Sequence, residues 1–421
     1  MNLVSVFKEK DLRKKIFFTL FMLFVFRVGA LIPVPGVDSS VIANLVESND
    51  LLSLYNMLVG GAFSTFTLFA LGVSPYITAS IVIQLLTYDV VPHFTELSKS
   101  GEVGRKILNK YTKILALILG LIQSIGITYG MVMPALKDRT PLAVALVVLT
   151  LLAGSMFLIW IGEKITEKGI GNGSSLIIFF GIITRLPSEI IGLVEGVKGG
   201  TINPWTLAFV LFVSFLVIIG VIFIQEGVRK IPVQYSTRVV GRKTYGGQES
   251  HIPMKINQSG VMPVIFASSI LALPQTIAMF MNADAQSFVQ KYLSPTGEFF
   301  WIYLLLEIVL IVFFSYFYTT LSFNTEDIAN NLKNSGGFIP GIRPGKPTQD
   351  YLSDISSKLT LAGAAFLSVI VIIPSIISNY TSIYLTLTGT SILIVVGVAL
   401  ELVKQLESNL VVRSYNSIFK K

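Results

Sequence analysis

The 421-residue sequence contains few side chains that could perform covalent or metal chemistry. It has no cysteine, which excludes disulfides, thiolate nucleophiles and cysteine-based metal sites. Its two histidines, His93 and His251, lie in polar stretches and cannot assemble a zinc site at membrane depth. The string GIRPGKP at 341–347 has the wrong spacing for a phosphate-binding loop and carries proline after its lysine. We therefore expect no metal, no cofactor and no enzymatic activity.

Charged residues inside apolar stretches are the next candidates, because a charge at membrane depth is usually functional. Arg27 and Glu307 are the chief examples. A proton- or ion-coupled transporter usually needs more such groups. Arg27 could equally pack against a helix or reach the membrane surface, and Glu307 could face another helix. Their roles stay open at this stage.

The composition indicates a membrane protein. Hydrophobic residues make up 52% of the chain and charged residues only 13%, whereas soluble proteins carry about 25% charged residues. About 20 continuous apolar residues span a membrane as a helix, and continuous rather than alternating runs argue against a β-barrel. The chain has ten runs of roughly this length, at 16–33, 71–87, 111–133, 141–161, 173–193, 205–225, 259–281, 300–321, 359–378 and 382–403.

The basic residues indicate the orientation of these runs. If both chain ends lie in the cytosol, the inside segments hold 26 of the 32 lysines and arginines and the outside segments hold five. No lysine or arginine occurs from Val28 to Ser98. Cytosolic loops of membrane proteins are enriched in these residues. The pattern therefore predicts an all-α membrane protein with ten transmembrane helices and both termini in the cytosol.

Two stretches do not look like ordinary spanning helices. The stretch 51–71 is apolar but is interrupted by Gly60 and Gly61 and by several polar residues, which suits a re-entrant segment covered by protein. An amphipathic segment at the membrane surface is the alternative. The segment 72–87 is short and polar on one side, which favours a position beside water, although simple helix packing would also explain it.

Nine motifs spread over the chain closely resemble the bacterial SecY family, the channel subunit of the general protein-secretion translocon. The similarity runs from about residue 10 to the C-terminus, and the motifs occur in the family's order. They are IPVPGVD (32–38), NMLVGGAFSTFTLFALGVSPYITASIVIQLL (56–86), GEVGRK (101–106), QSIGI (123–127), GEKITEKGIGNGSSLIIFFGI (162–182), PVQYSTR (232–238), MKINQSGVMPVIFASSI (254–270), NLKNSGGFIPGIRPGK (331–346) and GTSILIVVGVALELVKQLES (389–408).

The resemblance implies two pseudo-symmetric five-helix halves around a central pore, residues 1–200 and 201–421. It also implies that 51–71 is the family's re-entrant plug and that 72–87 is the half-helix lining the pore. The family passes unfolded secretory proteins across the bacterial plasma membrane and releases apolar segments sideways into lipid. The expected fold is therefore an all-α channel that opens like a clamshell.

The resemblance also assigns a ring of aliphatic side chains at the pore constriction. Such a ring disfavours water and ions without binding a passing peptide. A further ring position falls on Ser174, where the family usually has an aliphatic residue, so the ring is expected to be looser there. Ordinary packing is the alternative for any one member. The ring positions are Val73, Ile77, Ile178, Ile265 and Ile394.

A lateral gate is expected between the second and third helices on one side and the seventh and eighth on the other. Polar contacts across it would be weak enough to open, at about 0.6 kcal/mol each. Ordinary hydrogen bonds between helices are the alternative reading of the same side chains. The gate positions are Thr78, Gln84, Gln123 and Asn257.

The long inside loops 226–258 and 322–358 resemble the family's docking site for the ribosome and for the SecA motor ATPase. Basic side chains there could bind RNA phosphates or acidic motor residues, but the enrichment of basic residues in cytosolic loops would also place them there. Thr325 and Glu326 follow Asn324 where the family often has arginine, so one contact is expected to be missing. The docking candidates are Arg238, Arg242, Lys243 and Arg343.

The family implies further partners and leaves alternatives. Small SecE and SecG membrane subunits, unfolded preproteins with their signal sequences, and membrane lipid are the other expected partners. An accessory paralogue serving special substrates is one alternative. A ten-helix secondary transporter is another, although it should show a charged or broken-helix substrate site at the midplane, where this sequence has aliphatic residues.

Overall fold

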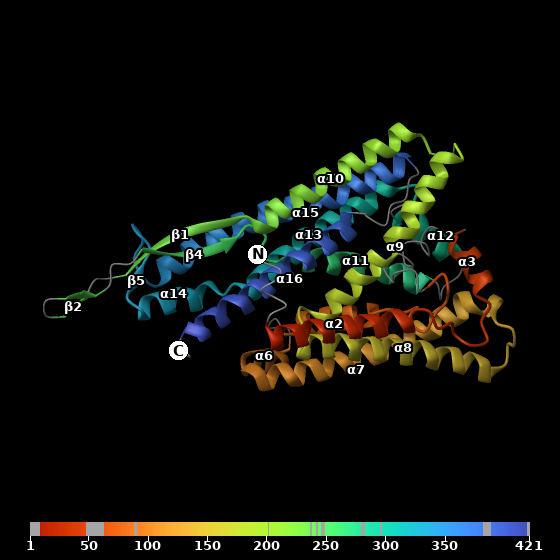
Figure 1. Cartoon of the computed structure of the whole chain (residues 1–421), viewed down its shortest axis with the longest axis horizontal. Coiled ribbons are helices and arrows are strands. Elements are labelled where there is room, and N and C mark those ends of the chain that lie inside the picture. The colour runs from red at the N-terminus through yellow and green to blue at the C-terminus, as the bar shows by residue number, and fades with distance from the viewer. Residues whose placement is uncertain are drawn as a thin grey trace.

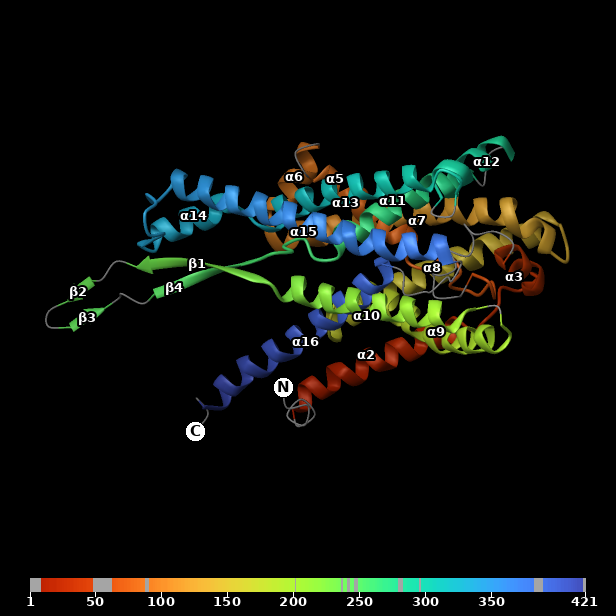
Figure 2. The same cartoon turned by 90° about the horizontal axis from the view of Figure 1, so that it is seen from above.

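The computed structural model describes residues 9–47, 63–87, 91–200, 202–235, 238–240, 243–245, 249–278, 283–294, 297–381 and 389–418. These residues form a helical bundle with a long β-hairpin projecting from one end (Figure 1). Figures 1 and 2 place the hairpin and α14 at this end, called the hairpin end here, and α3 and α12 at the opposite end. Helix α2 begins, and α16 finishes, toward the hairpin end (Figure 2).

Ten of the described helices overlap the ten apolar runs of the sequence, and four shorter helices lie between those runs. They are α2 (Lys10–Gly29), α3 (Ser39–Glu47), α5 (Ser74–Leu86), α6 (Pro92–Lys99), α7 (Gly101–Ile127), α8 (Pro141–Lys168), α9 (Gly173–Lys198), α10 (Pro204–Glu226), α11 (Met262–Ala278), α12 (Ala283–Tyr292), α13 (Phe300–Ser322), α14 (Thr325–Asn334), α15 (Lys346–Thr381) and α16 (Gly389–Ile418). The strands are β1 (Val228–Tyr235), β2 (Arg238–Val240), β3 (Lys243–Tyr245), β4 (Glu249–Lys255) and β5 (Gly337–Phe338).

Seven of the described helices are long and apolar enough to cross a membrane. The apolar parts of α5 and α11 are shorter, and α5 with its 13 residues is only about 20 Å long, against about 30 Å of membrane core. Helix α2 is amply long, with 20 residues, but its first turns carry charged residues. The chain is thus a mostly helical protein with multiple apolar helices, while the full set of ten crossings stays a prediction.

The long loops predicted at 226–258 and 322–358 are largely regular structure. Strand β1 pairs with β4 in an antiparallel hairpin, and β5 pairs with the end of β1, so both segments share one sheet. Helix α15 begins at Lys346, inside the second predicted loop, and is 36 residues long. Their common core joins Ile231 and Met254 of the hairpin to Leu352 and Ile355 of α15. The two segments therefore form one structural unit at the hairpin end.

A glycine-rich turn precedes α9. Gly171 has a φ of +83°, a conformation that favours glycine, and the Asn172 Oδ1 accepts hydrogen bonds from the amides of Ser174 and Ser175. The Thr19 hydroxyl of α2 accepts the amide of Ile170 at 3.0 Å. The turn thus begins α9 and also attaches it to α2.

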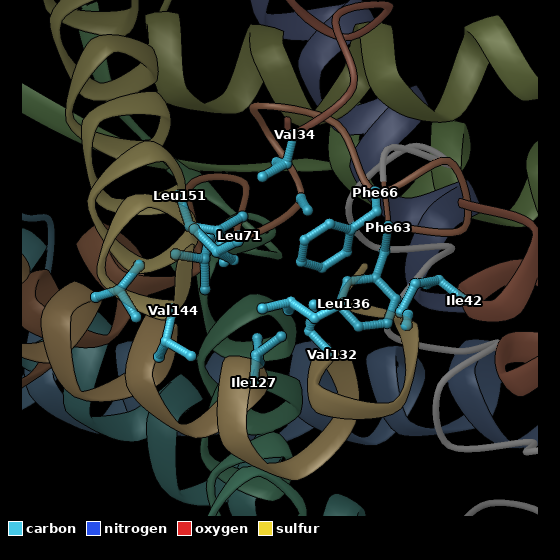
Figure 3. Packing of buried hydrophobic residues seen from close by; sticks show 14 of the residues in the cluster. Val34, Ile42, Phe63, Phe66, Leu71, Ile127, Val132, Leu136, Val144 and Leu151 are labelled. Carbon is cyan, nitrogen blue, oxygen red and sulfur yellow. The ribbon is translucent and has the colours of Figure 1, made fainter. Parts of the chain in front are cut away.

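An irregular segment, residues 63–73, passes through the bundle between α2 and α8. Its residues 63–71 belong to the stretch 51–71 predicted as a re-entrant plug, of which residues 51–62 lie outside the described part. Phe63, Phe66 and Leu71 are buried, and Figure 3 shows them packed among side chains from α7, α8 and the preceding loop. The Val34 amide donates to the Phe66 carbonyl at 2.9 Å. Neighbouring protein therefore covers this non-helical backbone.

Small residues on two helices allow the segment to approach closely. A Cβ added to Gly154 of α8 would overlap the backbone carbonyl of Leu68, and one added to Gly29 of α2 would overlap the Phe69 ring. The neighbouring Ser155 hydroxyl donates to the Gly72 carbonyl at 3.1 Å. The position of residues 63–73 therefore depends on these glycines.

We predict that Gly154→Ala destabilises the protein by about 1–3 kcal/mol, because the added methyl forces the backbone at Leu68 to move. Thermal unfolding of the purified protein in detergent measures this effect. Gly192→Ala is the matched control, since a Cβ there meets nothing within 4 Å. Equal unfolding midpoints for the two variants would show that the close approach at Gly154 is unimportant.

Candidate functional site

The five predicted ring residues all belong to one apolar cluster, called the constriction cluster here. Val73 and Ile394 are buried in it, and Ile77, Ile178 and Ile265 pack against it while half-exposed. These residues come from the end of the irregular segment and from α5, α9, α11 and α16. Elements far apart in the sequence thus supply one aliphatic side chain each to the same place.

Two adjoining cavities reach this cluster. The first has a volume of about 520 Å³ and is lined by Ile77, Ile178 and Ile265 among other residues. The second, of about 590 Å³, is lined by Ile265 and Ile394. Ser175, Met262 and Ile265 line both, so the two cavities share part of their lining and are together called the vestibule here, with a first and a second lobe. Four of the five ring residues line this vestibule and are called its aliphatic floor here.

The walls of the first lobe are polar. The Lys113 Nζ of α7 lies 2.7 Å from the Glu163 Oε1 of α8, and Lys106, Glu167 and Asn172 also line the lobe. These charged side chains are partly exposed, so their ion pairs add little stability, about 0–1 kcal/mol each. The first lobe therefore combines charged and polar side chains with the aliphatic floor in one lining.

Ser174, the expected departure from the ring, lies in this polar wall. It lines the first lobe together with Ser175, and its amide donates to the Asn172 Oδ1 at 3.1 Å. Ser174 is therefore part of the capped first turn of α9, one turn from Ile178. A hydroxyl at this position faces the hydrated lobe.

The four predicted gate residues lie on or next to the elements expected, but they do not form a polar seam. Among the described residues, no hydrogen bond joins any two of them. Asn257 bonds only within its own turn, to the Gly260 carbonyl at 2.9 Å and to the Ser259 hydroxyl at 3.1 Å. Thr78 and Gln123 are buried, and the Gln123 Oε1 has no hydrogen-bond partner.

Gln84 is the gate candidate with a contact across helices. Its Nε2 donates to the Ser80 hydroxyl on α5 at 2.9 Å, and its side chain also meets the hydroxyl of Tyr318 on α13. Both Gln84 and Tyr318 line the first lobe. Sequence reasoning missed Tyr318, because a lone tyrosine inside an apolar run gives no signal of its partner.

Most of the seam between α5 and α11 is apolar. Ile81 is 2% exposed and belongs to one cluster with Val264 and Phe266 of α11 and Phe314 of α13. The sequence shows Val73, Ile77 and Ile81 on one face of a helix, at spacings of four residues. That pattern indicates the buried face of α5 but does not identify the helix that covers it.

The docking candidates are only partly described. Arg343 is exposed in a turn between Gly341 and Gly345, whose φ angles are +83° and +98°, and its carbonyl accepts the Thr348 hydroxyl at 2.8 Å. Arg242 lies outside the described residues. Arg238 and Lys243 stand in the short strands β2 and β3, and their side chains lie outside the described part.

The remaining candidates have structural positions. The Asn324 Oδ1 accepts the amides of Glu326 and Asp327, so Asn324 caps α14, and Thr325 and Glu326 form its first turn. Arg27 is half-buried in the last turn of α2. Glu307 is 3% exposed within α13. Arg27 and Glu307 do not line either lobe of the vestibule.

An apolar helical bundle with a polar vestibule ending at an aliphatic floor defines a multi-pass membrane protein of the channel type. The family model for SecY matches residues 67–403. The "Protein translocase subunit SecY" of Bacillus subtilis is 43% identical over 98% of both chains, and that of Corynebacterium glutamicum is 41% identical over 99% of both. The chain belongs to the SecY family.

Solved structures share the fold. "The structure of a protein conducting channel" aligns with a TM-score of 0.71 and 20% identity, covering 94% of this chain and 92% of that one. "Sec61 in the Canine ribosome-channel complex from the endoplasmic reticulum" aligns with a TM-score of 0.67 and 18% identity, over 94% and 92% of the chains. At these identities the likeness concerns the architecture.

We predict that the triple variant Ile77→Ser, Ile178→Ser, Ile265→Ser conducts ions at rest, because hydroxyls hydrate a constriction that aliphatic side chains keep dry. Conductance of the purified protein in planar bilayers measures this. The matched control carries serine in place of Leu20, Ile122 and Ile219. These three native side chains lie on the bundle surface and are 55%, 52% and 47% exposed. If the triple variant conducts no more ions than the control, the constriction cluster is not the barrier to ions.

Proposed function

We propose that this protein is the channel through which unfolded secretory proteins cross a bacterial plasma membrane. The vestibule, which four isoleucines of the constriction cluster line, is the observation that carries this proposal. An extended polypeptide would enter the hydrated vestibule and pass between Ile77, Ile178, Ile265 and Ile394. Aliphatic side chains can part around any sequence, since they form no hydrogen bonds that must be broken.

The proposed topology has ten membrane crossings, with both termini in the cytosol. The short helix α5 then crosses together with the irregular segment 63–73, and α2 and α11 supply the other crossings beyond the seven long apolar helices. The halves 1–200 and 201–421 face each other across the constriction cluster. In this orientation the hairpin end, which carries Arg229, Lys230 and Arg343, is cytosolic, in agreement with the positive-inside rule.

Lateral release of apolar segments would occur at the seam between α5 and α11. This seam is held by Ile81 and Phe266 rather than by a polar ladder. Lipid tails are as apolar as these side chains, so separating them into lipid costs little compared with separating them into water. Gln84 and Tyr318 at the rim of the first lobe would separate in the same movement.

The hairpin end is the proposed docking surface for the SecA motor and the ribosome. Its shared sheet and the glycine-bounded turn at Arg343 present a basic side chain on a supported loop. One solved structure that shares the fold, with a TM-score of 0.65, is that of an idle yeast Ssh1 complex bound to the yeast 80S ribosome. Small SecE and SecG subunits would cover apolar helix surfaces. The chain itself would catalyse no covalent step, because the motor, the ribosome or the proton gradient would supply the energy.

Two other functions remain distinguishable. A secondary transporter would need a polar or charged substrate site at the constriction, where this chain has aliphatic side chains. An accessory paralogue would use the same channel for a few special substrates. The range of preproteins that depend on the protein separates this paralogue from the general channel.

We predict that depletion of the protein leads to rapid accumulation of many unprocessed preproteins, and that vesicles containing it with its motor import a model preprotein. A substrate with one apolar segment of about 20 residues should stay in the vesicle membrane, which tests lateral release in the same assay. Import that is equal in vesicles lacking the protein would contradict the proposal. Accumulation of only a few preproteins would favour the paralogue.

We also predict that Arg343→Glu weakens binding of the motor or ribosome by about tenfold or more, since a charge-assisted hydrogen bond contributes about 1.5–3 kcal/mol. Equilibrium binding to the reconstituted protein measures the effect. Lys198→Glu makes the same charge change at the exposed end of α9 and should leave binding unchanged. Equal affinities for the two variants would show that the basic residues of these loops only set the orientation of the protein in the membrane.

A further inference from the structure

Helix α12 carries an exposed aromatic side chain at the end of the bundle opposite the hairpin. It joins α11 to α13, and Figure 2 shows it at the edge of the bundle. The Phe288 ring is more than half exposed, and Phe299, directly before α13, is also exposed. Neither residue lines the vestibule, so the proposed path of the polypeptide does not account for these side chains.

Three aromatic rings form a continuous row from α12 to α13, called the aromatic row here. The centre of the Phe288 ring lies 4.7 Å from that of Tyr292, and the Tyr292 ring stacks on Phe299 with 4.6 Å between the centres. Phe299 precedes the first residue of α13, a helix long and apolar enough to cross a membrane. The aromatic row therefore lies where this helix reaches the end of the bundle.

The backbone between the two helices fixes α12 in this position. The Phe299 amide donates to the Lys291 carbonyl at 3.0 Å, so the chain folds back onto the last turn of α12 before α13 begins. A Cβ added to Gly297 would overlap the carbonyl oxygens of Gln290 and Lys291. The end of α12 is thus held against the start of α13.

The surface around the aromatic row has no surplus of charge. From residue 287 to residue 302 the sequence contains two charged side chains, and the Lys291 Nζ lies 3.6 Å from the Glu298 Oε2. A protein partner guided by electrostatic complementarity would need an unpaired charge here. Uncharged aromatic rings instead fit the boundary between lipid headgroups and acyl chains, where such side chains are enriched in membrane proteins.

The exposed row continues along one face of α13. Trp301, Leu305, Val309 and Phe313 are each more than half exposed, and they follow one another at intervals of four residues, which places them on the same side of the helix. Acyl chains are as apolar as these side chains, so such a stripe on a spanning helix is suited to lipid. Helix α12 therefore lies at the end of a lipid-facing stripe.

We propose that α12 lies in the membrane interface at this end of the protein, with Phe288 and Phe299 inserted between headgroups and acyl chains. Gln290 is exposed and lies roughly 200° from Phe288 around the helix, so it faces water. Helices with one apolar and one polar side lie flat in the interface in this way. The inference rests on the proposed function only for the leaflet, which is the outer one if the hairpin end is cytosolic.

Insertion of α12 has a consequence for the proposed lateral opening. Helices α11 and α13 pack through Phe266 and Phe314, whose ring centres are 5.6 Å apart, and both belong to one cluster with Ile81 of α5. Helix α12 links these two helices at the membrane surface. An inserted α12 would keep both helices at a constant depth while α5 separates from them.

The test uses single cysteines, which meet no background because the chain has none of its own. Phe288→Cys and Gln290→Cys are each modified with a nitroxide spin label, and the full-length protein is placed in lipid nanodiscs with one copy per disc. Electron paramagnetic resonance compares collisions of the label with oxygen, which concentrates among acyl chains, and with a polar nickel chelate, which stays in water. We expect oxygen to dominate at 288 and the chelate to dominate at 290, the matched control on the same helix.

Two results would overturn the inference. Equal collisions with the chelate at 288 and 290 would place α12 in water. Shielding of the label at 288 from both reagents would show that protein, rather than lipid, covers this side of the helix. Phe299→Cys repeats the measurement at the other end of the aromatic row, which keeps the test valid if Phe288→Cys misfolds.

A second measurement separates the leaflet from the insertion. Vesicles of uniform orientation carry a label at Gln290→Cys or at Asn334→Cys, an exposed position at the end of α14. An impermeant reductant added outside should reduce only one of the two labels, because the proposed topology places them on opposite sides of the membrane. Reduction of both would contradict the proposed topology and the outer leaflet, whereas the collisions at 288 alone decide the insertion.

Discussion

A water-filled vestibule inside a membrane protein must end at a wall that excludes water without holding on to whatever passes. Aliphatic side chains meet both demands, because they offer no hydrogen bond to water or to a peptide and disfavour water in a narrow space. Here α5, α9, α11 and α16 each bring one isoleucine to the lining of the vestibule, and Val73 is buried in the same cluster. The polar lining of the vestibule and the arrangement of the helices are best understood as consequences of the need for this aliphatic barrier.

The irregular segment 63–73 meets a second requirement of the membrane, the shielding of non-helical backbone. Backbone without regular hydrogen bonds is tolerated at membrane depth only where protein or a cavity covers it. Gly29 and Gly154 let the segment lie directly on α2 and α8, and Ser155 binds the Gly72 carbonyl. The segment leads directly into α5, which has only 13 residues.

Local sequence signals predicted most of the helices, whereas the ring, gate and docking positions came from the family's motifs and stay predictions. Long apolar runs indicated the spanning helices, and the glycine-rich turn before α9 was identifiable because its φ demand and Asn172 cap are local properties. The pairing of β1 with β5 was not predictable in this way, since it joins segments about 100 residues apart. The polar gate contacts were placed by motif alone, and their partners depend on tertiary packing. Asn257 forms its hydrogen bonds within its own turn, whereas Ile81 is buried in the apolar seam between α5 and α11.

The two seams beside the constriction differ in a way that bears on how the bundle can open. The seam between α5 and α11 depends mainly on apolar packing around Ile81, and such surfaces can exchange a neighbouring helix for lipid at small cost. The seam between α9 and α16 includes the Gly171 amide bonded to Gln405, with Leu402 of α16 packed close to Gly171. This hydrogen bond is exposed, so water could replace it if the two helices separated. The contrast between the seams therefore lies in their composition: the proposed lateral opening would exchange apolar contacts for lipid between α5 and α11, whereas the turn before α9 is tied to α16 by a hydrogen bond.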